Sequence, residues 1–223
     1  MTSARPDIPV PDFVSTLLLY GGGFDPPHRG HIELPRQVRG ALGADWLLYI
    51  PAAAPPLRDS GPVASEADRL AMVRAAIDGD LRASATDLEL VRGGTSYTID
   101  TVRSLREALP FVKKMRLLIG ADQAAQFHKW KSAGELIDLA EPVVVLRAPM
   151  ETRSALRQAM ADHCDEAEWE RWRGRIVRLP TIEASSTQIR QILRERGPDD
   201  PALRELLPTP VLELIRERGL YCD

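Results

Sequence analysis

The chain has little of what marks a secreted, disulfide-bonded or membrane-spanning protein. Only two cysteines, Cys164 and Cys222, occur in 223 residues. This excludes a disulfide framework and fits a reducing compartment. No apolar run reaches the roughly 18 residues that a membrane helix needs, and residues 1–15 lack the apolar core of a signal peptide. We therefore expect a cytoplasmic protein that does not bind membranes.

A strong excess of charge of one sign is also absent. The formal net charge is -3, with 27% of residues charged, which disfavours a broad nucleic-acid-binding face. An apolar fraction of 44% in a chain of this length is typical of one globular domain with a sizeable core. We expect a single domain over 1–223, with a loose leader over 1–15 and a C-terminal helical part over 181–223.

Short apolar runs alternate with helical patterns along the chain. Strands are expected at 16–21, 45–51, 114–120, 142–149 and 174–180, where the runs are apolar and end at glycine or proline. Helices are expected at 31–43, 65–80, 96–109, 185–195 and 210–218, and 150–173 is typical of peripheral helix. This order predicts a Rossmann-like α/β fold, an open parallel sheet with helices on both faces and a small C-terminal helical segment. The stretch 51–62 is expected to be mobile.

The segment GGGFDPPHRGH, residues 21–31, follows the first expected strand and suits an anion-binding turn. Ligands of open parallel sheets bind beyond the carboxyl ends of the strands, where glycines and a helix start present backbone N–H groups. His28 and His31 are three residues apart and share a helix face, so both imidazoles can reach one phosphate. An ordinary strand-to-helix turn and metal ligation are the alternatives, although no third ligand for a structural zinc is nearby.

The segment EASSTQIRQIL, residues 183–193, predicts a second phosphate site. Ser185 and Gln188 match an S-x-x-Q capping box. Thr187 and Arg190 lie three apart near the helix start, where a hydroxyl, a guanidinium and free N–H groups can hold a phosphate. The alternative is a capped helix with a solvated arginine.

These segments resemble those of the bacterial nicotinate-nucleotide adenylyltransferases, members of the H-x-G-H nucleotidylyltransferase superfamily. The opening loop matches G-G-T-F-D-P-x-H-x-G-H except that Gly23 replaces Thr or Ser, and the second segment matches I-S-S-T-x-I-R except for Ala184. Further similar stretches follow at 93–98, 118–130 and 206–221. The resemblance implies transfer of the adenylyl group of ATP, with Mg²⁺ on its triphosphate, to nicotinate mononucleotide. The products are deamido-NAD and pyrophosphate.

The resemblance also implies roles for individual residues. His28, His31 and Arg190 would stabilise the transferring and departing phosphates, and Trp130 would stack on the pyridine ring. Alternatives for Trp130 and Asp122 are an ordinary core residue and a helix N-cap. The ATP-binding residues are expected to be Gly22, Gly23, Phe24, Asp25, His28, His31, Gly120, Asp122, Ser185, Ser186, Thr187 and Arg190. The acceptor-binding residues are expected to be Arg58, Tyr97, Thr98, Trp130 and Lys131.

Three other functions stay open. The acceptor could be nicotinamide mononucleotide or phosphopantetheine, the nucleotide could be CTP with an alcohol phosphate, or the chain could be a non-catalytic nucleotide-binding regulator. Gly23 and Leu57 motivate the regulator, since each removes a polar group found in the family. The retained histidines and Arg190 argue against it. The Trp130 segment favours nicotinate, and the sequence does not decide between a monomer and a homo-oligomer.

Overall fold

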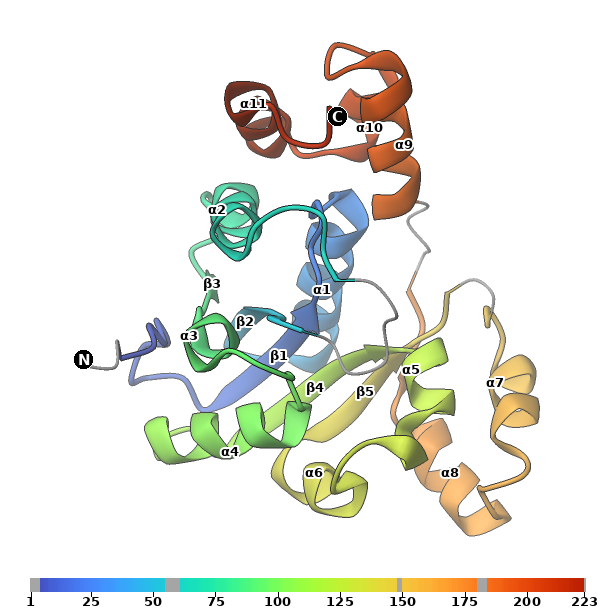
Figure 1. Ribbon diagram of the computed structural model, residues 1–223. Coiled ribbons are helices and arrows are strands. Elements are labelled where there is room, and N and C mark those ends of the chain that lie inside the picture. Colours follow the sequence, from blue (N-terminus) through green and yellow to red (C-terminus); the bar gives the residue numbers. More distant parts are fainter. Residues whose placement is uncertain (1–4, 55–60, 148–149, 180–183, 223) are drawn as a thin grey trace.

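The chain folds around one parallel sheet. The computed structural model describes residues 5–54, 61–147, 150–179 and 184–222. Six strands in these ranges form the order β3-β2-β1-β4-β5-β6, with every pair parallel (Figure 1). The predicted Rossmann-like α/β fold is therefore confirmed. The strands are β1 (Thr16–Gly22), β2 (Trp46–Pro51), β3 (Ala83–Ala85), β4 (Lys114–Gly120), β5 (Glu141–Val145) and β6 (Ile176–Val177).

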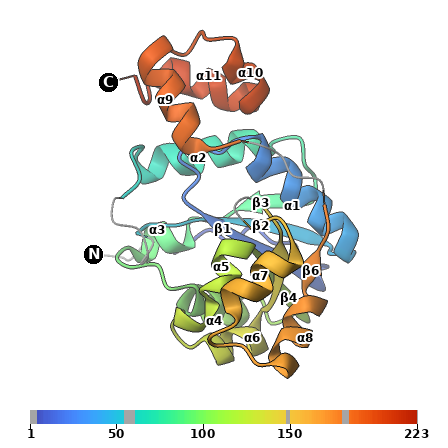
Figure 2. The same cartoon turned by 90° about the vertical axis from the view of Figure 1, so that its right-hand side faces the viewer.

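Helices cover both faces of the sheet, as predicted (Figure 2). One face carries α1 (Arg29–Leu42) and α2 (Glu66–Ile77), which bury Ile32, Val38 and Val73 against it. The opposite face carries α4 (Thr98–Ala108), α5 (Ala121–Ala125), α6 (Ala133–Leu139), α7 (Arg153–Met160) and α8 (Glu166–Gly174). The short α3 (Leu88–Arg92) and the 3₁₀ turn η1 (Phe127–Lys129) also lie on that side.

The strands are apolar throughout because their side chains enter a different core on each face. Leu17 and Leu19 of β1 pack in the cluster under α4 to α8, whereas Leu18 between them packs in the cluster under α1 and α2. Alternate residues of a strand point to opposite faces. A parallel sheet covered on both sides therefore requires apolar residues at every position.

A third apolar cluster lies in the C-terminal helices. Helices α9 (Ser186–Arg196), α10 (Ala202–Leu206) and α11 (Thr209–Arg218) pack their apolar sides together, and Met72 of α2 joins them. Figure 1 shows this unit, in orange and red, above α2. The expected C-terminal helical segment is thus present over the described residues 184–222 and packs on α2.

Some expected elements differ in the structure. The strand Ala83–Ala85 was not predicted, because its small residues carry no apolar run. Strand β5 ends at Val145 rather than 149, and β6 is only Ile176–Val177. The segment 150–173 is less peripheral than expected, since α7 buries Leu156 and Met160 in the core and α8 buries Trp169 and Trp172.

The sequence analysis expects a loose leader over 1–15, but residues 5–15, which the structure describes, pack against the domain. Thr86 Oγ1 donates a hydrogen bond of 2.5 Å to the carbonyl of Asp7, and Ile8 and Val10 pack against the core. Apolar side chains thus hold this segment on the domain. Of the stretch expected to be mobile, 55–60 lie outside the described residues. No helix in the described ranges is long and apolar enough to cross a membrane.

Candidate active site

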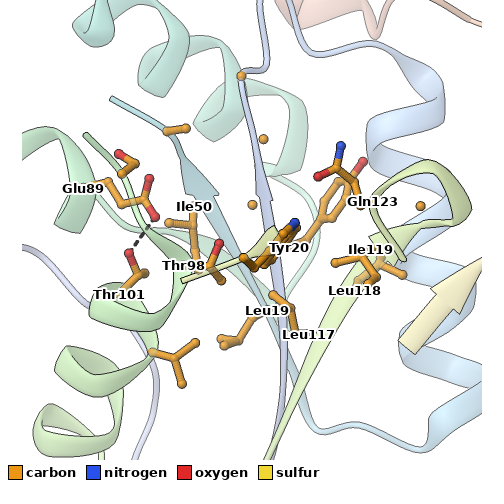
Figure 3. Close-up of a pocket in the computed structure, with 18 of the residues that line it drawn as sticks. Leu19, Tyr20, Ile50, Glu89, Thr98, Thr101, Leu117, Leu118, Ile119 and Gln123 are labelled. Carbon is orange, nitrogen blue, oxygen red and sulfur yellow. Dashed lines mark hydrogen bonds between the residues drawn. The ribbon is translucent and has the colours of Figure 1, made fainter. Parts of the chain in front are cut away.

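The strand order reverses at β1, which pairs with β2 on one side and with β4 on the other. A crevice forms beyond the carboxyl ends of the strands at such a point, and ligands bind there. A cavity of about 370 Å³ lies at this place, lined by the ends of β1 and β4 and the start of α4. Figure 3 shows Glu89 and Thr101 at one end of the cavity and Gln123 at the other. After the roles that the sequence analysis expects of their residues, we call these the acceptor end and the phosphate end.

The two histidines of the opening loop lie together at the start of α1, as predicted. Their rings are stacked, with centroids 3.7 Å apart and planes 25° apart. The backbone N–H of His28 donates to Nδ1 of His31 at 3.3 Å. Since Nδ1 of His31 accepts, the proton of the neutral ring belongs on Nε2. His31 lines the cavity and is therefore set up to donate a hydrogen bond to a bound phosphate.

His28 is a neutral imidazole at pH 7. It is 7% exposed, and burial together with the positive charge of Arg147 lowers its pKa to about 4. Its Nδ1 is buried and has no hydrogen-bond partner among the described residues. A buried polar atom without a partner is costly, so a ligand oxygen or proton donor at this position would stabilise the site.

An ion pair closes the phosphate end of the cavity. Asp122 at the start of α5 accepts hydrogen bonds of 3.1 Å from Nη2 and 3.3 Å from Nε of Arg147, which follows β5. Gly120 leaves room for this pair, because a Cβ there would lie 2.4 Å from Asp122 Oδ1 and 2.8 Å from Arg147 Nε. Asp122 is not the N-cap of α5, a position that Gly120 holds, so the alternative reading of Asp122 is wrong.

The acceptor end combines a helix start with an aromatic wall. Tyr97 and Thr98, the N-cap and first residue of α4, line the cavity, and the first backbone N–H groups of a helix attract anions. Trp130 also lines it and is stacked on Phe127, with centroids 5.0 Å apart. Lys131 Nζ lies 4.6 Å from the centre of the Tyr97 ring. This end therefore offers a flat apolar face beside a positive helix terminus.

A buried carboxylate, Glu89, lies beside that helix start. It accepts a 2.6 Å hydrogen bond from Thr101 Oγ1, which in turn accepts one of 2.9 Å from Arg92 (Figure 3 shows the first). Arg92 is also 4.0 Å from the Glu89 carboxylate. Opposite charge and hydrogen bonding compensate the burial of Glu89, and the network fixes α3 against α4.

The second predicted phosphate motif contacts the opening loop rather than lining the cavity. Arg190 Nη1 donates 2.6 Å to the carbonyl of Asp25, and its Nη2 lies 3.4 Å from Thr187 Oγ1. Ser186 Oγ donates 2.9 Å to the carbonyl of Pro26. The predicted pairing of Thr187 with Arg190 is thus present. Ser185 is the N-cap of α9 but its side chain makes no cap hydrogen bond, so the expected capping box is wrong.

The opening loop and the second predicted phosphate motif are in contact, but not every predicted residue lies on the cavity wall. Phe24, Asp25 and His28 lie behind the wall in the loop, while Asp122 reaches it through Arg147. Leu57 and Arg58 lie outside the described residues. The predicted residues that line the cavity are Gly22, Gly23, His31, Gly120, Tyr97, Thr98, Trp130 and Lys131.

Sequence reasoning missed Arg147 and Glu89. Arg147 lies two residues beyond the end of β5, near the edge of an open sheet where side chains reach the ligand. The expected strand over 142–149 included Arg147, and this boundary hid its position. Glu89 had no local signal, because β3 before it was not predicted and α3 is only five residues long.

The chain is similar in sequence to a known family and to named proteins. Residues 19–192 match the family model described as cytidylyltransferase-like. A protein of Neisseria meningitidis named "Probable nicotinate-nucleotide adenylyltransferase" is 34% identical over 211 residues, 91% of this chain and 96% of its own. One of Marinobacter nauticus with the same name is 37% identical over 212 residues, 92% and 95% of the two chains.

A solved structure has the same fold. It is the Plasmodium falciparum nicotinic acid mononucleotide adenylyltransferase complexed with NaAD, which matches with a TM-score of 0.71 over 93% of this chain and 97% of its own. At 15% identity, this likeness bears on the fold alone. The family-model match and the sequence relatives decide the family: the chain belongs to the nicotinate-nucleotide adenylyltransferases of the cytidylyltransferase-like family.

Proposed function

We infer that the protein transfers the adenylyl group of ATP to nicotinate mononucleotide, releasing pyrophosphate and forming deamido-NAD, a step in NAD biosynthesis. The observation that carries this inference is one cavity with two different ends. The phosphate end has His31 on its wall, with His28 stacked behind it, and the acceptor end has Trp130 beside the start of α4. Adenylyl transfer between two phosphates needs both ends at once.

The chemistry requires positioning more than an activated side chain. The 5′-phosphate of the acceptor attacks the α-phosphorus of ATP in line, the new P–O bond forms, and the bond to pyrophosphate breaks. A phosphate monoester is already ionised at pH 7, so no serine or cysteine nucleophile is needed. His31 donates from Nε2 to the oxygens that gain charge, and neutral His28 supports it from behind.

The departing pyrophosphate is proposed to meet Arg190 and Thr187. Both lie outside the cavity wall, beside the loop at Asp25. The triphosphate would therefore extend from His31 past the loop toward α9. The N–H groups at the start of α9 have no side-chain cap, so they are available to phosphate oxygens.

The acceptor's charge suits the other end of the cavity. A nicotinate ring carries a carboxylate, which backbone N–H groups near Thr98 and Lys131 can bind. Its aromatic ring can stack on Trp130. An amide in place of the carboxylate would lose the attraction of the α4 terminus, and this favours nicotinate over nicotinamide.

Mg²⁺ would enter as part of the ATP substrate, shielding the triphosphate charge. Among the described residues no group of three or more His, Cys, Asp or Glu is placed to hold a metal ion. The proposed ligands of the ion are therefore phosphate oxygens. The cytoplasm, where ATP is abundant, is the proposed location.

A pyrophosphate-release assay tests the function. Purified protein with Mg²⁺ and ATP is given nicotinate mononucleotide, nicotinamide mononucleotide or phosphopantetheine in turn, and CTP replaces ATP in a parallel set. We expect fastest release with ATP and nicotinate mononucleotide. Equal or faster release with another acceptor would assign the protein to a sibling activity. Binding of ATP without release for any acceptor would support a non-catalytic regulator.

A further inference from the structure

A residue far along the sequence reaches the loop that carries the two histidines. The hydroxyl of Tyr221, beyond the end of α11, donates a 2.8 Å hydrogen bond to Oδ1 of Asp25. Tyr221 is 8% exposed and Asp25 is 5% exposed. The bond is thus shielded from water, where a hydrogen bond to a charged group is strong and its loss is costly.

Asp25 joins several segments at once. Its carboxylate accepts from the backbone N–H of Val63 at 2.7 Å and of Ala64 at 3.0 Å, just before α2. Arg190 lies 3.8 Å from Oδ2 and donates to the Asp25 carbonyl at 2.6 Å. The Tyr221 hydroxyl therefore completes the set of partners that orients this carboxylate. Together these contacts connect the opening loop to the start of α2, to α9 and to the residues that follow α11.

The contact leads directly to His31. Phe24, next to Asp25, is 1% exposed and packs edge-on against the His31 ring, with centroids 5.3 Å apart and planes 79° apart. Phe24 and Tyr221 both have positive φ, 49° and 65°. Bulky residues avoid this region unless their surroundings fix them there. The strained backbone on both sides of the Tyr221–Asp25 bond indicates that the bond holds one defined arrangement.

We propose, on the basis of the function proposed above, that Tyr221 is a positioning residue for adenylyl transfer. Through Asp25 it fixes the loop that places Phe24, and thereby His31, against the phosphate end of the cavity. The same hydrogen bond holds Asp25 where Arg190 can meet its carbonyl. Tyr221 does not line the cavity and is not expected to touch either substrate.

The substitution Tyr221→Phe removes only the hydroxyl, and Tyr49→Phe is the matched control. Tyr49 is also a buried tyrosine, and its ring packs edge-on against Phe24, but its hydroxyl lies 3.5 Å from the carbonyl of Ile32 and makes no hydrogen bond to Asp25 that resembles that of Tyr221. We expect kcat of Tyr221→Phe to fall about tenfold, the effect of about one buried hydrogen bond. KM for nicotinate mononucleotide should stay within about twofold. Tyr49→Phe should retain wild-type kcat, and thermal unfolding of both variants shows how much each is destabilised.

The variant Asp25→Asn, alone and combined with Tyr221→Phe, tests whether Tyr221 acts through Asp25. If Tyr221 acts through Asp25, the double variant should be no slower than Asp25→Asn alone. A Tyr221→Phe enzyme that loses thermal stability as Tyr49→Phe does, yet keeps wild-type kcat, would overturn the inference. So would an additive loss in the double variant.

A readout without activity separates this inference from the proposed function. NMR spectra of protein with labelled histidines report the ring environments of His28, His31, His128 and His163. In Tyr221→Phe we expect the signals of His28 and His31 to shift and those of His128 and His163 to stay. Wild-type protein that releases no pyrophosphate with any acceptor refutes the proposed function alone. Unchanged signals of His28 and His31 refute the role of Tyr221.

Discussion

The imidazole of His31 accepts a hydrogen bond from the backbone of His28 while the two rings stack 3.7 Å apart. The first residue therefore sets the tautomer of the second. A neutral His31 in this arrangement carries its proton on Nε2, and we propose that this atom donates to a phosphate oxygen. We propose that the pair acts as one unit, in which His28 orients the ring of His31 and His31 donates to the phosphate.

Replacing His31 by Ala should lower kcat by about 100-fold or more, the usual effect of losing one donor to a charge-developing oxygen. Circular dichroism should show an unchanged fold. His128→Ala serves as control, because that histidine pairs with His163 instead. Near-normal turnover by His31→Ala would contradict the assignment of the phosphate end.

The burial of His28 should make stability depend on pH. The unfolded chain binds a proton at His28 with a pKa near 6.5, whereas the folded chain binds it only near 4. The unfolded state therefore gains more protons as the pH falls through this window, and the folded state loses stability. From pH 7 to 4 the loss should be on the order of 3 kcal/mol. Urea unfolding of wild type and His28→Gln between pH 7 and 4 measures this loss. If the free energy of unfolding depends on pH in the same way for both proteins, the loss does not come from His28.

Adding a methyl group at Gly120 should disrupt the pair Asp122 and Arg147. The new Cβ would meet both side chains at under 3 Å, so one of them must move. We expect Gly120→Ala to lower kcat/KM for ATP about tenfold, in the range of other overpacking costs. Gly134→Ala is the matched control, since nothing lies within 4 Å of a Cβ there. Equal kinetics of the two variants would show that the pair does not serve the phosphate end.

Removing the indole of Trp130 should weaken binding of the acceptor and leave binding of ATP unchanged. Stacking of a base on an aromatic ring is worth about 1–3 kcal/mol, so Trp130→Ala should raise KM for nicotinate mononucleotide about tenfold. KM for ATP should change little, and Trp130→Phe should restore part of the loss. Steady-state titrations of each substrate distinguish this from a general loss of activity, which would count against a stacking role.

Restoring a hydroxyl at position 23 should raise turnover. Gly23 lines the cavity just beyond β1. The family motif that the loop resembles has Thr or Ser at this position. Gly23 is not among the described glycines with positive φ. Its backbone conformation is therefore one that a residue with a side chain can adopt. We expect Gly23→Thr to increase kcat severalfold. If kcat stays at the wild-type value, the backbone N–H groups of the loop already supply what the hydroxyl would add.

The sheet was largely predictable because strands buried on both faces must be apolar at every position. This holds for Leu17–Leu19 and Val143–Val145, and it fails for Ala83–Ala85, which is paired with β2 but carries no large side chain. The contact between His28 and His31 was predictable because the two residues are three positions apart at the start of a helix. Contacts between distant segments leave no local pattern, so Arg190 was expected on a phosphate and is found on Asp25.

The contact between Asp25 and Tyr221 spans 196 positions of the sequence. A ribosome that has translated residues 1–200 has already made the whole sheet and both histidines of the loop. The partner that fixes the loop is still missing at that stage. Synthesis therefore completes the sheet and the loop about twenty codons before the residue that we propose holds the loop in place.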